Sequence, residues 1–192
     1  MRFSPLSVSG ARLVEAEPHV DERGTFARAW CRREFAGAGL EVDFVQANVA
    51  RSRAAGTLRG LHWQEEPHAE AKLVRCTRGA VYDVIADVRP GSPTFLEWSG
   101  VELEAGDGRQ VFVPAGCAHG YQALRGGTEI FYMVSAFYAP EAERGIRWDD
   151  PAFDVEWPMA PAEVSDKDRG WPPFEPGAPG ASAVGGSGGD DG

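Results

Sequence analysis

The sequence is poor in cysteine and has no long apolar run. Three cysteines occur in 192 residues, Cys31, Cys76 and Cys117, and none of them forms a CxxC pair. A disulfide framework or a zinc knuckle is therefore not expected, and a reducing compartment is the simplest prediction. No stretch approaches the roughly 20 apolar residues of a membrane span, and the N-terminus has no apolar run of signal-peptide length. We therefore expect a cytoplasmic protein in which Cys76 and Cys117 are small apolar core residues.

Positive charge is also scarce. The chain carries 19 Lys and Arg against 29 Asp and Glu, which gives a formal net charge of -10 and a pI of about 4.9. Such a balance argues against nucleic acid or an anionic membrane as a partner. It does not exclude a phosphate ligand, because a few basic side chains can form a local pocket.

The pattern of short β-type runs and turns predicts an all-β fold. With 24 glycines and 14 prolines, turns are frequent, and one short helix is expected at residues 31–37. Residues 73–76 and 80–88 are expected to form a hairpin around Gly79. Residues 129–138 are expected to form one long strand, with Tyr132 and Tyr138 on the same face and Phe137 in the core. Other expected β-type runs are 12–17, 25–30, 44–50, 95–103, 110–113 and 120–124.

These elements favour a sandwich, barrel or jelly roll with short peripheral helices. The 192-residue length suggests one domain, which we place at residues 1–175. Residues 176–192, PGAPGASAVGGSGGDDG, form a Gly-, Ser- and Pro-rich tail. Its composition cannot bury enough apolar surface to offset its ordering entropy, so we expect it to be disordered.

The stretch from residue 58 to residue 76, LRGLHWQEEPHAEAKLVRC, contains the strongest functional signal. His62 can serve as a base near neutral pH, and Arg59 and Lys72 supply positive charge nearby. Two segments, Gly56-x5-His62 and Gly108-x5-Pro-Ala-Gly-x2-His119, resemble the halves of a cupin metal motif. The second ligand position, however, holds Gln64, a poor ligand for a transition metal, and Glu66 and Glu70 are not at the expected spacing. We therefore expect a cupin barrel without a catalytic metal or other cofactor.

Several blocks in order resemble one family. LRGLHWQ, KLVRC, VPAGCAHGY, TEIFY and VSDKD are similar to blocks of the dTDP-4-dehydrorhamnose 3,5-epimerases, the RmlC-like cupins, and the match extends from about residue 21 to residue 174. The resemblance implies a jelly-roll cupin that acts as a homodimer without metal. It also implies inversion of C3, C5 or both in a 4-keto-6-deoxy sugar linked to a nucleoside diphosphate, most simply a dTDP sugar.

The resemblance also implies roles for individual residues. His62 matches the base, Tyr132 the acid on the opposite face of the sugar, and Asp168 the carboxylate that orients the base. Lys72 and His119 match residues near the sugar carbonyl and phosphates, and Asp83 matches the partner of His119. The remaining expected substrate-binding residues are Arg23, Arg28, Gln46, Asn48, Arg59, Tyr138, Glu143 and Lys167.

This chemistry requires these groups for a physical reason. A proton on a carbon beside a ketone is acidic because the resulting enolate delocalises onto oxygen. Removing it requires a base with a pKa near the working pH and a donor that faces the developing oxyanion. Histidine can be this base, and lysine can be this donor. Inversion further requires an acid on the opposite face of the sugar, which returns a proton to the carbon.

One departure from the family pattern and several alternatives remain. DERGTFAR places Arg28 where the family often has an acidic nucleotide contact, so the identity of the base or sugar stays open. Other possible functions are a mono-epimerase, a sugar-nucleotide 3,4-ketoisomerase, a metal-dependent cupin oxygenase and a non-catalytic nucleotide-sugar-binding module. Taken singly, His62, Tyr132 and Asp168 could equally be structural residues.

Overall fold

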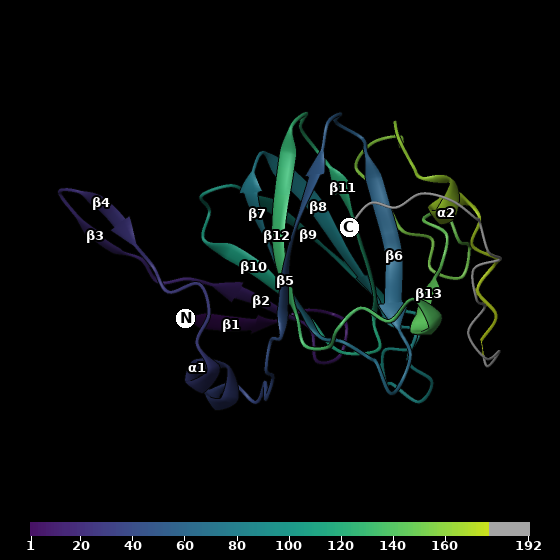
Figure 1. The fold of residues 1–192 in the computed structure, drawn as a ribbon, viewed down its shortest axis with the longest axis horizontal. Helices are drawn as coiled ribbons and strands as arrows, with labels where there is room; N and C mark the ends of the chain where they lie inside the picture. Colours follow the sequence, from purple (N-terminus) through teal and green to yellow (C-terminus); the bar gives the residue numbers. More distant parts are fainter. Residues whose placement is uncertain (177–192) are drawn as a thin grey trace.

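The computed structural model describes residues 1–176 and consists mainly of two antiparallel sheets that face each other (Figure 1). The strands are β1 (Arg2–Pro5), β2 (Arg12–Glu15), β3 (His19–Asp21), β4 (Gly24–Phe26), β5 (Gln46–Ser52), β6 (Leu58–Gln64), β7 (Lys72–Arg78), β8 (Ala80–Ala86), β9 (Trp98–Glu104), β10 (Arg109–Val113), β11 (Ala118–Ala123), β12 (Thr128–Val134) and β13 (Glu143–Gly145). The helices are α1 (Arg32–Gly37), α2 (Asp166–Arg169) and the 3-10 turn η1 (Pro140–Ala142). The predicted all-β cupin jelly roll with short peripheral helices is confirmed.

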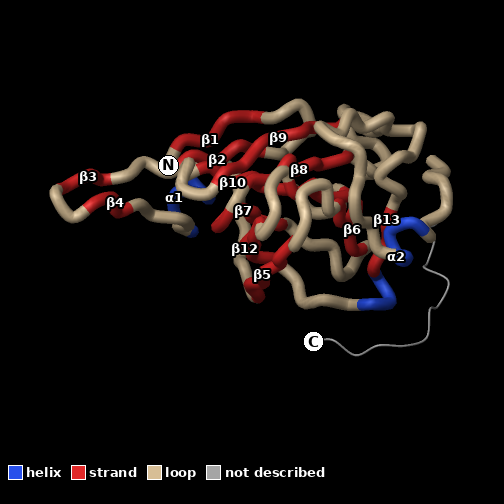
Figure 2. Tube along the Cα trace, turned by 90° about the horizontal axis from the view of Figure 1, so that it is seen from above, coloured by secondary structure: helices blue, strands red, loops and turns tan. Residues whose placement is uncertain are grey.

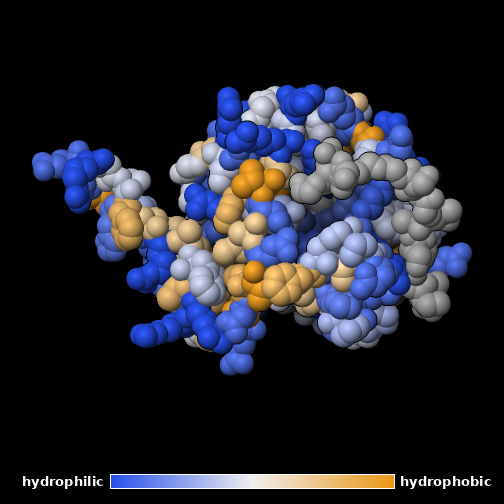
Figure 3. All heavy atoms as spheres, in the orientation of Figure 1, coloured by the Kyte–Doolittle hydropathy of each residue, from blue (hydrophilic) through white to orange (hydrophobic). Residues whose placement is uncertain are grey.

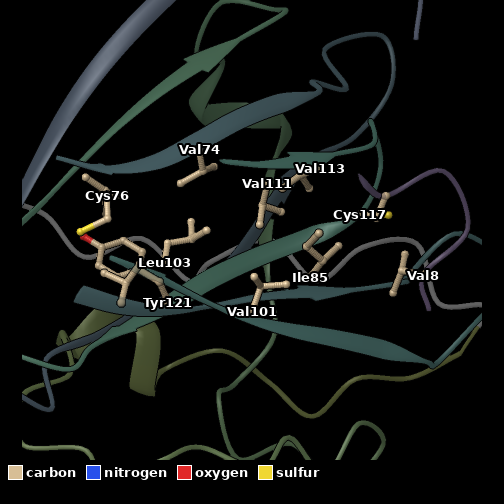
Figure 4. Packing of buried hydrophobic residues seen from close by; sticks show 13 residues of the cluster. Val8, Val74, Cys76, Ile85, Val101, Leu103, Val111, Val113, Cys117 and Tyr121 are labelled. Atoms are coloured by element: carbon tan, nitrogen blue, oxygen red, sulfur yellow. The ribbon is translucent and has the colours of Figure 1, made fainter. Parts of the chain in front are cut away.

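One sheet has the strand order β1-β2-β10-β7-β12-β5, and the other has the order β13-β6-β11-β8-β9. A core cluster fills the space between the sheets at one end of the barrel, and its side chains point toward one another from both sheets (Figure 4). Val81 and Leu103 from one sheet pack with Val111 from the other, and all three are fully buried. Cys76 and Cys117 belong to this cluster, which confirms their predicted place in the core.

A third sheet, of two strands, lies apart from the barrel. β3 and β4 form a two-stranded arm that projects from the body in both views (Figures 1 and 2). Val20 and Phe26 on this arm are 75% and 73% exposed. Residues 27–30 leave the strand, so the β-run predicted at 25–30 ends at Phe26. The helix predicted at 31–37 is present as α1.

The predicted hairpin around Gly79 is wrong. β7 pairs with β10 and β12, whereas β8 pairs with β9 and β11, so the two consecutive strands lie in different sheets. Gly79 has the expected positive φ, +75°, and a side chain there would collide with Thr128. The glycine therefore marks the corner where the chain crosses from one sheet to the other.

The long strand predicted at 129–138 is also wrong in its extent. β12 ends at Val134, because the chain turns away after its last pairing with β5 and β7. Phe137 is consequently 68% exposed and not part of the core, and Tyr138 lies beyond the strand. The predicted tail at 176–192 lies outside the described residues except for Pro176. None of the helices in residues 1–176 is long and apolar enough to cross a membrane.

Candidate active site

The open half of the barrel contains a cavity of about 570 Å³ between the two sheets. The surface is hollowed beside β5 and β12, with hydrophilic residues along the hollow (Figure 3). Several expected site residues line this cavity: Arg59, His62, Lys72, His119, Tyr132, Lys167 and Asp168. A smaller cavity of about 300 Å³ shares His62, Lys72 and Tyr132 with it and adds Gln46, Asn48, Tyr138 and Glu143. The sequence-predicted residues, Arg23, Arg28 and Asp83 excepted, thus line two adjoining cavities.

His62 lies on β6 and forms a short hydrogen bond with Asp168. The distance from Nε2 to Asp168 Oδ1 is 2.6 Å, and the Asp168 side chain is 5% exposed. Because a carboxylate accepts, the neutral imidazole carries its proton on Nε2 and leaves Nδ1 as the free base nitrogen. The ring of Trp171 packs edge-on against the imidazole at 6.0 Å between centroids. The carboxylate and the indole together hold the orientation of the base.

Asp168 reaches His62 because the C-terminal segment is bound to the start of β6. Leu58 N–H donates to the Glu163 carbonyl at 2.8 Å, and Thr57 forms a parallel bridge with Glu163. Ser165 then caps α2, since its Oγ accepts the Asp168 N–H at 3.1 Å. A residue 106 positions away in sequence is thereby placed against the base.

The environment of Asp168 favours its charged form. Burial alone raises the pKa of this carboxyl, but the hydrogen bond from His62 and the Gly60 N–H outweigh it. The net result is a pKa below the ordinary value for aspartate. The carboxylate therefore stays ionised wherever His62 could act as a base.

His119 forms a second histidine–carboxylate pair. Its Nε2 lies 3.0 and 2.9 Å from the two oxygens of Asp83, and both residues are buried. Asp83 on β8 stands beside Tyr121 of β11 in the sheet register and does not itself line the cavity. The pair therefore presents His119 to the cavity from a fixed position.

Two glycines bring the histidines opposite each other. His62 and His119 are register partners where β6 meets β11, next to an irregularity in the pairing. A Cβ at Gly60, which has φ +104°, would lie 2.6 Å from the Gly120 Cα, and one at Gly120 would lie 2.5 Å from the Arg59 carbonyl oxygen. Since real Cβ atoms do not approach so closely, both positions require glycine. The main chains of the two strands are thus in contact at the centre of the site.

Tyr132 enters the same cavity from the opposite sheet. It lies on β12, whereas His62 and His119 lie on β6 and β11. Burial raises the pKa of the phenol, the nearby Glu70 carboxylate raises it further, and Arg59 and Asn48 offset this only in part. The phenol therefore keeps its proton well into the alkaline range, as an acid catalyst requires.

The remaining polar residues form a rim around the smaller cavity. Gln46 Nε2 donates to Asn48 Oδ1 at 3.0 Å on β5. Tyr138 donates to Glu143 at 2.8 Å, and Lys167 Nζ lies 2.6 Å from both oxygens of the same carboxylate. Glu143 thus joins Tyr138, which lines the smaller cavity, to Lys167, which lines the larger one.

Arg23 and Arg28 are not brought to the cavity of their own chain. Arg23 lies on the arm, 85% exposed, and pairs with Asp21. Arg28 donates to Glu34 at 2.6 Å, beside the N-terminal ammonium of Met1 on the same carboxylate. Neither arginine lines the larger or the smaller cavity.

Sequence reasoning missed the part that Glu70 and Gln64 play. Glu70 Oε1 lies 3.1 Å from Lys72 Nζ, and Gln64 Nε2 donates to Glu70 at 3.0 Å. Strand alternation gave no signal for this contact, because Glu70 precedes β7, which begins at Lys72. Among the described residues no group of three or more His, Cys, Asp and Glu side chains is arranged to hold a metal ion.

Comparisons with known proteins agree with this geometry. The family model of dTDP-4-dehydrorhamnose 3,5-epimerase matches residues 5–176. A dTDP-4-dehydrorhamnose 3,5-epimerase from Sinorhizobium fredii is 44% identical over 173 residues, which cover 90% of this chain and 89% of the relative. The crystal structure of the Bacillus anthracis epimerase, with TDP and PPi bound, superposes with a TM-score of 0.86 at 38% identity, covering 90% of this chain and 99% of that one.

A second similar solved structure is named for epimerisation at one carbon only. It is a 3'-monoepimerase from Streptomyces bikiniensis in complex with dTDP-quinovose. Its TM-score is 0.80 at 36% identity, and the alignment covers 88% of this chain and 85% of that chain. Because the family model spans nearly all described residues and the relatives align over most of their own length, the chain belongs to the dTDP-4-dehydrorhamnose 3,5-epimerase family.

Proposed function

We propose that this cavity epimerises a 4-keto-6-deoxy sugar of a nucleoside diphosphate, most simply a dTDP sugar, at C3, C5 or both. One observation carries the proposal: an imidazole with a free nitrogen and a protonated phenol enter one cavity from opposite sheets. A sugar ring between them would present one face to His62 and the other to Tyr132. Removal and return of a proton on opposite faces is what inversion requires.

The proposed reaction has two proton transfers. His62 Nδ1 takes the proton from the carbon beside the ketone, and the C–H electron pair forms the enolate, whose charge resides on the carbonyl oxygen. The Lys72 ammonium stabilises this oxyanion, a role typically worth about 3 kcal/mol per donor. His119 contributes in its doubly protonated form, in which Nε2–H donates to Asp83 and Nδ1–H is left for the oxyanion. Tyr132 then donates its proton to the opposite face while the enolate electrons return to carbon and the carbonyl re-forms. Solvent restores both groups to their starting protonation states.

Solvent labelling tests the proposal directly. The purified protein is incubated with dTDP-4-keto-6-deoxyglucose in D2O, and the sugar is analysed by NMR. We expect deuterium at C3 and C5; label at one carbon alone would assign a mono-epimerase, as in the S. bikiniensis structure. No label with dTDP, CDP or GDP sugars would contradict the proposal, and a carbonyl moved to C3 would indicate a ketoisomerase instead.

We also propose a homodimer in which the arm of one subunit completes the cavity of the other. Three features support it: Arg23 and Phe26 lie on the projecting arm and line neither cavity, β5 is an edge strand of its sheet, and Val49 on β5 is 57% exposed. A mixing experiment tests this arrangement. Arg23→Ala and His62→Ala subunits are each impaired, but in a mixed dimer one cavity has both an intact base and an intact arm. Random reassembly should then restore about a quarter of wild-type sites, and no recovery would contradict the shared site.

Two further expectations remain predictions. Metal independence rests on Gln64, whose amide is bonded to Glu70; elemental analysis of active protein tests it. A cytoplasmic location rests on the three unpaired cysteine thiols, and cell fractionation tests it.

A further inference from the structure

Glu70 forms an almost completely buried ion pair in the wall of the site. Its Oε1 lies 3.1 Å from Lys72 Nζ, and the two side chains are 11% and 10% exposed. At such depth an unpaired ammonium is strongly unfavourable, so the carboxylate compensates the charge of Lys72. Surface ion pairs of this chain, such as Arg125 with Glu104, are more than half exposed and do not fix a side chain in this way.

Glu70 is itself held in place by Gln64. Gln64 Nε2 donates to Glu70 Oε2 at 3.0 Å and to the His68 carbonyl at 3.0 Å, while its Oε1 accepts the Ala139 N–H at 2.6 Å. Gln64 is 2% exposed, so no solvent competes for these bonds. Gln64, at the position where metal-binding cupins have a second ligand, thus connects the Glu70 carboxylate to the main chain at His68 and Ala139.

The same network reaches the base. Lys72 Nζ also points to the main-chain carbonyl of His62, at 3.4 Å. The ammonium therefore lies between the Glu70 carboxylate and the strand that carries the imidazole. A lysine side chain is long and flexible, and by itself it would not occupy one position.

We propose that Glu70 is a positioning residue for the epimerisation: its carboxylate holds the Lys72 ammonium where the sugar oxyanion develops. This inference rests on the function proposed above. A donor accelerates such a step when it is already in place before the charge forms, because no reorganisation is then needed. Glu70 fixes the position of the Lys72 ammonium, although its negative charge also cancels part of the positive potential that Lys72 creates in the cavity.

Glu70 also acts on the acid. The titratable groups that line the two cavities together with Tyr132 are Arg59, His62, Glu70, Lys72, His119, Tyr121, Tyr138, Glu143, Glu163, Lys167 and Asp168. Among them Glu70 is the charge that raises the pKa of the phenol, and Arg59 lowers it. Removing the negative charge of Glu70 therefore lowers the pKa of Tyr132, and the alkaline limb of the pH–rate profile moves to lower pH.

The test compares Glu70→Gln with Glu129→Gln. The first keeps the shape of the side chain and an acceptor oxygen but removes the charge. The second makes the same change on β12, in an ion pair with Arg51 that does not line either cavity. For Glu70→Gln we expect kcat to fall about tenfold with KM within twofold, since one donor becomes mobile and binding groups are untouched. Glu129→Gln should retain wild-type values.

A double-mutant cycle shows whether Glu70 acts through Lys72. In a Lys72→Met background Glu70→Gln should change kcat by less than about twofold, because there is no ammonium left to position. The chain has only two lysines, Lys72 and Lys167, so a lysine-labelled NMR sample resolves Lys72 without reference to activity. Its Cε signal should sharpen in Glu70→Gln, as the side chain gains motion.

The outcomes separate this inference from the proposed function. Deuterium incorporation by the wild type with an unchanged kcat in Glu70→Gln would overturn the positioning role and leave the epimerase proposal standing. An effect on KM alone, or a tenfold loss that persists in the Lys72→Met background, would overturn it as well. Absence of label with the wild type would instead remove the proposed function, and with it this inference.

Discussion

Two histidine–aspartate pairs face the same cavity and differ in construction. His119 and Asp83 come from neighbouring strands of one sheet, and their side chains are 8% and 0% exposed. His62 is 27% exposed, and its partner Asp168 arrives on a four-residue helix from the far end of the chain. The first pair is part of the barrel, whereas the second is assembled only when the C-terminal segment binds to β6. The barrel itself therefore fixes His119, whereas the position of the base depends on the C-terminal segment.

The largest contrast is expected when each imidazole is removed. His62→Ala should lower kcat about 1,000-fold, because it removes the only base proposed for the carbon-bound proton. His119→Ala should lower kcat about tenfold to 100-fold through a weaker oxyanion site. Deuterium incorporation measures both, with dTDP binding by calorimetry as the control for folding. Equal losses in the two variants would erase the proposed division of roles.

Removing the charge of each aspartate should also lower kcat more for the His62 pair than for the His119 pair, but the two losses should be smaller than those of the histidine variants. Asp168→Asn should lower kcat about 100-fold, since an amide no longer fixes the proton on His62 Nε2 and the free nitrogen on Nδ1. Asp83→Asn should cost about tenfold, because its histidine is proposed only to donate a hydrogen bond. Steady-state kinetics provides the comparison, and 15N NMR of the imidazoles reports the tautomers. A larger effect at Asp83 would reverse the assignment.

The cap of α2 sharpens the comparison further. Ser165→Ala removes the acceptor for the Asp168 N–H and should destabilise this turn by about 1 kcal/mol. We expect kcat to fall a few-fold and amide exchange to rise around residues 162–169, with exchange in β8 and β11 unchanged. Ser165→Asp, which retains a capping oxygen, is the matched control and should behave like the wild type.

The smallest effect concerns stability in acid. The folded-state pKa of Asp168 is lowered, so its contribution to stability is present above about pH 4, the unfolded value, and is lost as pH falls through the folded value. Asp87 should lose its contribution to stability in the same direction. Burial raises its pKa, but hydrogen bonds from Arg89, Ser92 and Thr94 outweigh burial and hold the pKa at about 2. Urea unfolding from pH 6 to pH 2.5 should therefore give a shallower loss in Asp168→Asn than in the wild type. Parallel curves would show that the pair adds nothing to acid sensitivity.

Local patterns predicted the fold class and most strand positions, but not which strands pair. Residues 73–76 and 80–88 flank a glycine turn, as hairpin strands do, yet each strand finds its partners in a different sheet. Strand partners are chosen by the burial of whole faces, which the turn does not encode. The extent of β12 and the exposure of Phe137 were mistaken for the same reason, since an apolar residue past the last pairing looks like core in sequence.

The site was predictable to the extent that family blocks carry it. The blocks LRGLHWQ and VSDKD placed His62 and Asp168 together although 106 residues separate them, and the structure brings them into contact. The contacts of Glu70 with Gln64 and Lys72 are not predictable in this way, because the sequence shows Gln64 only as a poor metal ligand at a cupin ligand position. Side chains that support other side chains follow no spacing rule as clear as a metal motif.

The close crossing of β6 and β11 at Gly60 and Gly120 has a consequence for how this protein could evolve. With main chain resting on main chain, the separation of the two imidazoles is a property of the backbone and not of any replaceable side chain. Adaptation to a new sugar or nucleotide would then have to occur farther from the two histidines, among residues of the smaller cavity such as Asn48 and Glu143, while the reacting centre keeps its dimensions.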